Sequence, residues 1–318
     1  MSKVYHYTFN AKLFLLHNKR VQMIHGHYFH FIDEPSLQDD HSLPPNKECK
    51  HIDVKQNNNT TIPETYSFER LWVPLSGQEG RYFAKTPFEE ADESFSWGLE
   101  IKNVLILIWE PKEQNIRYIK GLHYTPQRLR FWTYHTFFPM SLEFNHIYHF
   151  LHVGAVEVQG KTLFFSAPSF GGKSTLTDYF MQQGATLISD DALGIEEQEG
   201  VYTAIPAYPY HRPYREPEEL GYKVENFASK AKKVDAVFLL KKADANAKIN
   251  IQEVKGIEKF KAFHHAVFIE FPFRKEERFK FFGDMVQSVP VYTVTIPWDL
   301  TRLHEVHKAL IGLALPNA

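Results

Sequence analysis

The chain has 318 residues, and 43% of them are hydrophobic, which is enough for one large core or two modest cores. With 36 Lys and Arg against 38 Asp and Glu, its net charge of −2 gives no general attraction to nucleic acid or to an anionic membrane, so we expect neither partner. Cys49 is the only cysteine, which excludes an intrachain disulfide, and the longest strongly apolar run, residues 104–109, is too short to span a bilayer, so we expect a cytoplasmic protein.

Runs of aromatic and β-branched residues predict a β-rich N-terminal domain over residues 1–124. Residues 28–32 are expected to form a strand, and residues 103–109 are expected to pair with 115–120 as a hairpin. The polar stretch 35–63 predicts a long exposed loop.

Three histidines in this domain, His25, His27 and His30, form an H-x-H-x-x-H pattern. The first two would share one face of a strand, as two metal ligands do. Because no cysteine or carboxylate cluster accompanies them, the pattern favours a half-exposed strand over a metal site.

A second domain is predicted over residues 125–318, and it begins with a helical lead-in over 125–150. Thr125 is placed to cap the helix, with Pro126 at its first position, and Pro139 is expected to break or kink it before it resumes over 140–150. His146 and His149 would then lie on this helix. Farther along, the pattern predicts a hairpin around 198–200, strands over 234–240 and 291–296, and helices over 275–286 and 300–313.

The most informative stretch reads APSFGGKS, residues 167–174, between a predicted strand over 162–166 and a predicted helix over 174–183. In that setting the loop N–H groups and the helix N-terminus favour a nucleotide's phosphates, with Lys173 at the β- and γ-phosphates and Ser174 on Mg²⁺. The full pattern has glycine where this chain has Ala167, so an ordinary strand-to-helix turn is the alternative. The predicted nucleotide-binding residues are Ala167, Pro168, Ser169, Phe170, Gly171, Gly172, Lys173, Ser174 and Thr175.

Two carboxylates follow a short apolar strand predicted over 185–189. Asp190 and Asp191 would lie at the carboxyl end of that strand, where one can hold the metal and the other can accept a proton from an attacking hydroxyl. Upstream, His152 could assist a carboxylate in moving a proton. The structural alternatives are that the acidic pair caps a turn and that His152 is a buried core residue.

Residues 152–191 resemble the catalytic core of the HPr kinase/phosphorylase family, which are serine kinases with the phosphoenolpyruvate-carboxykinase type of phosphate loop. The intervals of 21 residues from His152 to Lys173 and of 17 from Lys173 to Asp190 match the family pattern. The resemblance implies an α/β fold with a mixed β-sheet kinase domain, ATP or another nucleoside triphosphate, and Mg²⁺ held by Ser174 and Asp191. It also implies that Asp190, oriented by His152, accepts the proton of a serine hydroxyl on a peptide or protein. Ala167 and Phe170 depart from the family's glycines.

The proline-rich stretch 206–217 carries further candidates. Its prolines would stiffen a loop that presents tyrosines and arginines outward, and Arg212 or Arg215 could neutralise the charge on a transferring phosphoryl group. Alternatively, the arginines form surface pairs and the tyrosines pack on the sheet. The sequence thus predicts a kinase, with a non-catalytic nucleotide-binding module or a small-molecule kinase as alternatives, and leaves open whether the chain forms a homo-oligomer.

Overall fold

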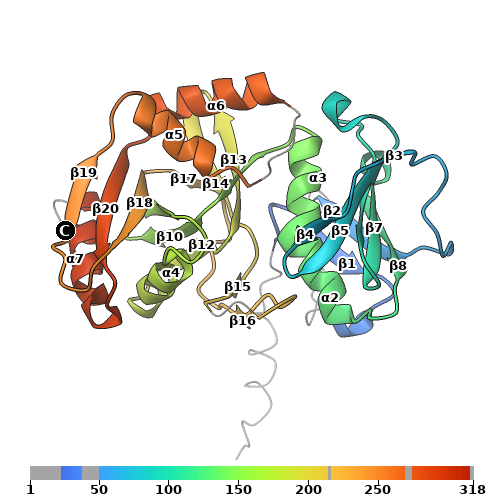
Figure 1. Cartoon of the computed structure of the whole chain (residues 1–318), viewed down its shortest axis with the longest axis horizontal. Coiled ribbons are helices and arrows are strands. Elements are labelled where there is room, and N and C mark those ends of the chain that lie inside the picture. Colours follow the sequence, from blue (N-terminus) through green and yellow to red (C-terminus); the bar gives the residue numbers. More distant parts are fainter. Residues whose placement is uncertain (1–22, 38–49, 214–215, 269–273, 316–318) are drawn as a thin grey trace, which may run out of the picture.

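A computed structural model describes residues 23–37, 50–213, 216–268 and 274–315. The described chain is a mixed α/β protein with two halves that lie side by side (Figure 1). Cys49 and Arg215 lie outside the described residues. None of the helices in the described part of the chain is long and apolar enough to cross a membrane.

The N-terminal half is built on an eight-stranded sheet in which β1, β2 and β8 run parallel and the remaining neighbours run antiparallel. The expected strand at 28–32 and the expected hairpin are confirmed as β1 and as β7 with β8. The strands are β1 (Tyr28–Phe31), β2 (His51–Gln56), β3 (Phe68–Glu69), β4 (Val73–Leu75), β5 (Gln78–Ala84), β6 (Trp97–Ile101), β7 (Leu105–Glu110) and β8 (Asn115–Lys120).

Two expectations for this half are wrong. The stretch 35–63 is not one long loop, because it contains β2, whose Ile52 and Val54 alternate with polar residues and are buried. His25 and His27 do not share a strand face either. They lie in a tight turn closed by the Ile24–His27 bridge, and both rings are buried.

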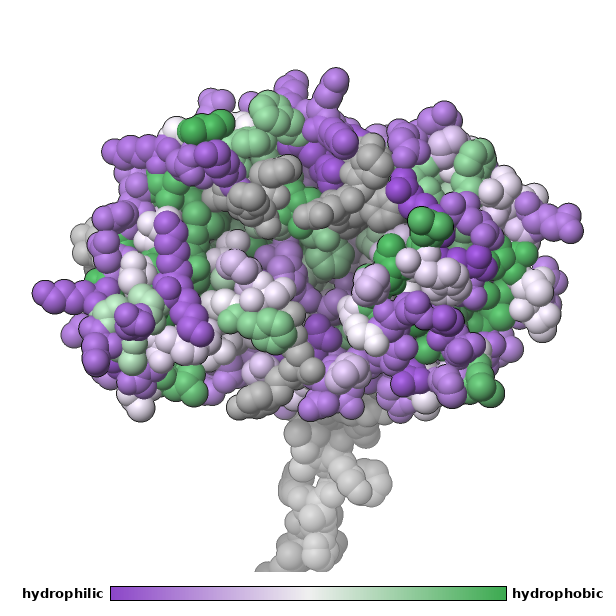
Figure 2. Space-filling view, in the orientation of Figure 1, coloured by the Kyte–Doolittle hydropathy of each residue, from purple (hydrophilic) through white to green (hydrophobic). Residues whose placement is uncertain are grey.

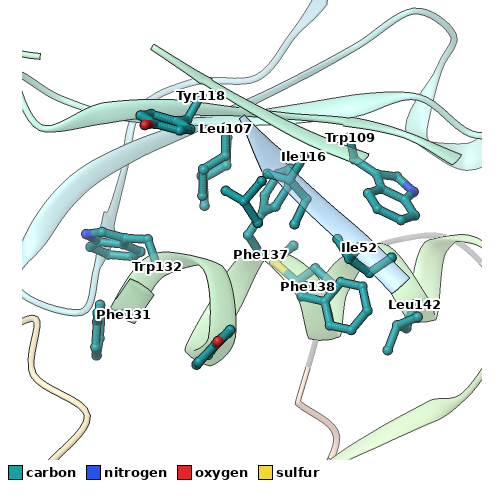
Figure 3. Packing of buried hydrophobic residues seen from close by; sticks show 14 of the residues in the cluster. Ile52, Leu107, Trp109, Ile116, Tyr118, Phe131, Trp132, Phe137, Phe138 and Leu142 are labelled. Carbon is teal, nitrogen blue, oxygen red and sulfur yellow. The ribbon is translucent and has the colours of Figure 1, made fainter. Parts of the chain in front are cut away.

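One continuous helical segment packs against this sheet. It consists of α2 (Pro126–Phe131), a π-helical turn (Trp132–Phe137) and α3 (Phe138–Phe144), and Thr125 accepts the capping hydrogen bond from the N–H of Arg128. Figure 3 shows apolar side chains that meet between the segment and the sheet: Trp132, Phe137, Phe138 and Leu142 from the helix, with Ile52, Leu107, Trp109, Ile116 and Tyr118 from the strands. The helix therefore shares the core of the N-terminal half.

The end of this helix differs from the expectation. Pro139 does not break the segment, because it lies in the first turn of α3, directly after the π turn, where a missing N–H is tolerated. The helix ends at Phe144 rather than at residue 150, and His149 lies on strand β9 (His149–His152). The boundary at residues 124 and 125 remains a prediction.

The second half contains a six-stranded sheet, ordered β12-β10-β11-β18-β20-β19, and a four-stranded sheet, ordered β17-β14-β13-β9. In the first sheet β11, β18 and β20 are parallel neighbours. Its strands are β10 (Gly154–Val158), β11 (Lys161–Ser166), β12 (Thr186–Ser189), β18 (Ala236–Ala243), β19 (Asn250–Glu253) and β20 (Val291–Pro297). The second comprises β9, β13 (Ala192–Gln198), β14 (Val201–Ile205) and β17 (Lys232–Lys233), and β15 (Tyr210–His211) pairs with β16 (Tyr222–Lys223).

Alternating residues of the six-stranded sheet build two cores. Leu163 and Phe165 of β11 pack with helices α4 (Lys173–Gln182) and α7 (Leu303–Ala314) on one face. Phe164 points to the other face, where the four-stranded sheet and helices α5 (Ile257–His265) and α6 (Lys275–Ser288) complete the core. These layers fix α4 against β10 and β11, at the place where the predicted phosphate loop lies (Figure 1).

The elements predicted after residue 191 are largely confirmed. The hairpin is β13 with β14, the two strands are β18 and β20, and the two helices are α6 and α7, the latter preceded by a short 3-10 turn (Leu300–Arg302). Helix α5 was not predicted.

Acid sensitivity of the N-terminal half follows from its buried histidines. Burial, together with the neighbouring His27 charge, lowers the pKa of His25 to about 3. Below its ordinary pKa of 6.5 this histidine takes up a proton in the unfolded chain but not in the folded chain, so stability falls as the pH drops toward 4. We expect His25→Phe to make that slope shallower by up to about 1.4 kcal/mol per pH unit in urea unfolding. The exposed His123, changed to Phe, is the control, and an unchanged slope in His25→Phe would contradict the assignment.

Candidate functional site

The predicted phosphate loop has the conformation expected of a strand, a tight turn and a helix start. β11 ends at Ser166 and α4 begins at Lys173. Gly172 has a φ of +91°, which favours glycine, and a Cβ at Gly171 would lie 2.7 Å from the Cβ of Ala167. The two glycines are therefore needed by the backbone of the loop.

Lys173 is the buried cation of this loop. Lys173 is only 4% exposed, and its Nζ donates a hydrogen bond to the carbonyl oxygen of Ala167 at 2.6 Å, across the loop. Ser174 and Thr175 are half-buried in the first helical turn, whereas Pro168, Ser169 and Phe170 are exposed. Phe170 has a φ of +60°, a conformation that costs a non-glycine residue about 1 kcal/mol and that glycine adopts freely.

The acidic pair lies where two neighbouring segments of the chain pass from one sheet of the second half to the other. β9 continues into β10, and β12 continues into β13, while β9 pairs with β13 and β10 pairs with β12. This register sets His152 opposite Ala192, and the N–H of Val153 donates to the carbonyl oxygen of Asp191 at 3.0 Å. The histidine predicted from the sequence is therefore next to the acidic pair.

Asp191 is a buried carboxylate that lies next to two histidines and one arginine. Nδ1 of His152 lies 2.6 Å from its Oδ1, Nε2 of His135 lies 2.7 Å from its Oδ2, and the Arg212 guanidinium approaches Oδ2 at 3.7 Å. Burial alone would raise the pKa of Asp191, but the charge of His152 and the hydrogen bond with His135 outweigh burial and hold this pKa well below its usual range. Asp191 is thus ionised throughout the neutral range.

The partner of His152 differs from the one that the sequence predicts. His152 contacts Asp191 and not Asp190, because the strand register places its ring on the second carboxylate. Asp190 instead accepts a hydrogen bond from the backbone N–H of Arg212 at 2.8 Å, and its Oδ1 lies 3.2 Å from Nδ1 of His211. Among the described residues, no side chain or backbone group makes a hydrogen bond to that buried Oδ1.

His211 lies between the acidic pair and α4, the helix that follows the predicted phosphate loop. Its ring is fully buried, with Asp190 on one nitrogen and Asp178 of α4 on the other, at 3.5 Å. Asp178 lies four residues after Ser174 and therefore on the same face of α4. Next to this face, a Cβ at Gly154 of β10 would lie 2.4 Å from Oγ1 of Thr177, so the strand and helix touch. His211 thus links the acidic pair to the first turns of α4.

The proline-rich stretch folds inward rather than outward. Tyr208 and Tyr210 are buried in the core of the N-terminal half, as the packing alternative predicts. Arg212 lies with its guanidinium over the ring of Phe131, at 5.5 Å, and faces Asp191. This places a predicted arginine beside the acidic pair.

His135 is the site residue that the sequence did not indicate. It lies in the π turn of the N-terminal helix and is stacked on Phe131, with ring centroids 4.8 Å apart. A π turn interrupts the α-helical spacing of side chains and often occurs at functional sites. Only the docking of this helix brings His135 to a carboxylate 56 residues away in sequence.

Known proteins show a structural likeness to this chain but no match in sequence. No protein-family model and no curated protein sequence matches the chain. Among solved structures, the Hpr(Ser) kinase/phosphatase from Coxiella burnetii aligns with 52% of this chain and 97% of its own, at 10% identity and a TM-score of 0.32. At that score the likeness carries no argument about function, which must therefore come from the geometry of the site.

Removing the Asp191 charge should destabilise the protein in a pH-dependent way. The lowered pKa means that the carboxylate stabilises the fold above the ordinary value of 3.8 and that this stabilisation is lost as the pH falls further. We expect Asp191→Asn to lower the free energy of unfolding at pH 7 by about 3 kcal/mol, since Arg212 and the two histidines lose a charged partner. The gap to the wild type should narrow below pH 3.8 in urea unfolding. Exposed Asp244, changed to Asn, is the control, and equal losses in both variants would refute the pairing.

Proposed function

We propose that the chain is a nucleotide-dependent kinase that transfers a γ-phosphoryl group to a hydroxyl. The observation that carries this proposal is the joining of two parts by His211: a glycine-bearing loop with buried Lys173, and the buried Asp190–Asp191 pair. A phosphate-binding loop beside a carboxylate–histidine cluster is the arrangement that phosphoryl transfer requires, because catalysis there is mainly positioning and charge neutralisation.

The loop residues would hold ATP or another nucleoside triphosphate. Backbone N–H groups of residues 172–175 would contact the phosphates at the start of α4. The Lys173 ammonium would release the carbonyl oxygen of Ala167 and bind the β- and γ-phosphates instead. Phe170, in the same loop, is 83% exposed.

The residues present fit a magnesium ion. Mg²⁺ is usually held by one or two protein oxygens, with water and phosphate completing its shell. Each aspartate has a buried Oδ1 without a hydrogen bond from any described residue, but the histidine nitrogen beside Asp190 lies 3.2 Å away, whereas Asp191 has histidine nitrogens at 2.6 and 2.7 Å from its two oxygens. Asp190 is therefore the carboxylate less engaged by histidine. Ser174 and Asp190 would hold the ion, and when bound it would neutralise charge on the β- and γ-phosphates.

His152 and Asp191 would form the proton-accepting pair. Asp191 is buried and ionised, and it would keep the proton of the neutral imidazole on Nδ1, leaving Nε2 to accept a proton. The side chain of His152 is 27% exposed, so it can reach an acceptor that the buried carboxylate cannot. As the acceptor oxygen bonds to the γ-phosphorus, its proton passes to Nε2 and the bond to the β–γ bridging oxygen breaks.

The acceptor that we propose is a serine hydroxyl of a peptide or protein, as the family resemblance implies. Arg212, with its guanidinium beside Asp191, would steady the cluster and add positive charge near the transferred group. Mass spectrometry after incubation with Mg·ATP tests this acceptor on the proteins encoded beside the gene. Phosphoserine supports it, whereas transfer only to small hydroxyl compounds would establish a small-molecule kinase.

Lys173 should be required for transfer. We expect Lys173→Met, which keeps the buried stem but removes the charge, to lower the rate of phosphoryl transfer from radiolabelled ATP at least about a thousandfold. Exposed Lys230, changed to Met, should keep the wild-type rate. Transfer at the wild-type rate by Lys173→Met would eliminate the proposed function.

His152 should act on the chemical step and not on nucleotide binding. His152→Gln should lower kcat by roughly 10²- to 10⁴-fold, because the acceptor proton has no base, while the Kd of Mg·ATP stays within about twofold of the wild type. His304, which is exposed on α7, offers the matched substitution His304→Gln with no effect on kcat. Retention of kcat in His152→Gln would assign the base to another group.

A further inference from the structure

An exposed tryptophan lies against the phosphate loop and has no part in the proposed transfer. Trp298 directly follows β20, and 44% of it is exposed. A Cβ at Gly172 would lie only 3.3 Å from its ring, so the ring touches the loop one residue before Lys173. The ring is therefore placed where it can contact a ligand held by the loop.

The strand arrangement explains why Trp298 lies there. β11, β18 and β20 are parallel neighbours, so their carboxyl ends open onto one edge of the sheet. β11 leads into the phosphate loop, and β20 leads into Trp298. The backbone N–H of Trp298 donates to the carbonyl oxygen of Ala243 at the end of β18, at 3.0 Å. Ligands of such sheets bind outside the carboxyl ends of parallel strands, where the loop and the tryptophan meet.

Lys242 fixes the ring and makes its surroundings positive. Its ammonium lies 3.9 Å from the centre of the Trp298 ring, which is a close cation–π contact. The ring is thus anchored by its backbone hydrogen bond and by this cation while much of it stays open to solvent. An anchored aromatic surface loses little side-chain freedom when it binds a flat ligand.

We propose that Trp298 is the stacking platform for the base of the nucleotide whose phosphates occupy the loop. This inference rests on the proposed function, because it requires a nucleoside triphosphate at Lys173. Stacking on an aromatic ring does not depend on the hydrogen-bonding groups of the base, so the platform accepts adenine and guanine alike. Trp298 therefore supplies affinity for a nucleoside over a bare polyphosphate.

The test compares two magnesium-loaded probes by isothermal titration calorimetry: AMP-PNP, which carries the base, and tripolyphosphate, which lacks it. We expect Trp298→Ala to weaken the binding of AMP-PNP about tenfold and to leave the affinity for tripolyphosphate unchanged. Trp298→Phe should recover most of the lost affinity. Trp72 is the matched control, because it is 38% exposed and has Arg81 and Lys102 over its ring, but lies on the N-terminal sheet. Trp72→Ala should bind both probes like the wild type.

The outcomes separate this inference from the proposed function. If Trp298→Ala weakens the binding of both probes equally, or of neither, the stacking platform is refuted, while nucleotide binding at the loop remains supported. Binding of neither probe by the wild type overturns the proposed function and the platform with it. A base-dependent loss confined to Trp298→Ala, with kcat at saturating nucleotide unchanged, supports the platform.

Discussion

The architecture around the site depends on the stabilisation of one buried negative charge. A carboxylate in a protein interior needs cations and hydrogen bonds close by, and Asp191 receives them from three separate segments of the chain. His152 comes from the strand that leaves the four-stranded sheet, His135 from the N-terminal helix, and Arg212 from the proline-rich stretch. These segments must therefore converge where β12 meets β13, and the two halves of the molecule join at that point.

The same convergence explains why the contact between the halves contains both apolar and polar side chains. The core of the N-terminal half includes Phe150, Ala192 and Tyr208, which belong to the second half of the sequence. Buried Glu218 adds polar links, since it accepts a hydrogen bond from Nε1 of Trp132 and pairs with Arg128. The face in Figure 2 is largely hydrophilic at its outline, and hydrophobic residues are visible in the hollow between the halves.

Local signals in the sequence predict the phosphate loop and the acidic pair, because glycines, lysine and strand ends are read over a few residues. They do not predict which aspartate meets His152, since neighbouring residues point to opposite sides and the choice depends on the register between β9 and β13. β2 was missed although Ile52 and Val54 alternate with polar residues, because the surrounding asparagines and prolines suggested a loop. His135 could not be predicted, because its place depends on the docking of a helix onto the other half.

The π turn gives the helix over residues 126–144 one residue more than a regular α-helix, and the position of His135 depends on that residue. Residues 132–137 follow i→i+5 hydrogen bonding, so the segment holds one residue more than an α-helix of the same path. Deleting a single residue there would shift His135 away from Asp191, and it would also place Pro139 inside a regular helix, where its missing N–H and its ring are not tolerated. The extra residue of the π turn therefore lets one helix carry both the proline and the site histidine.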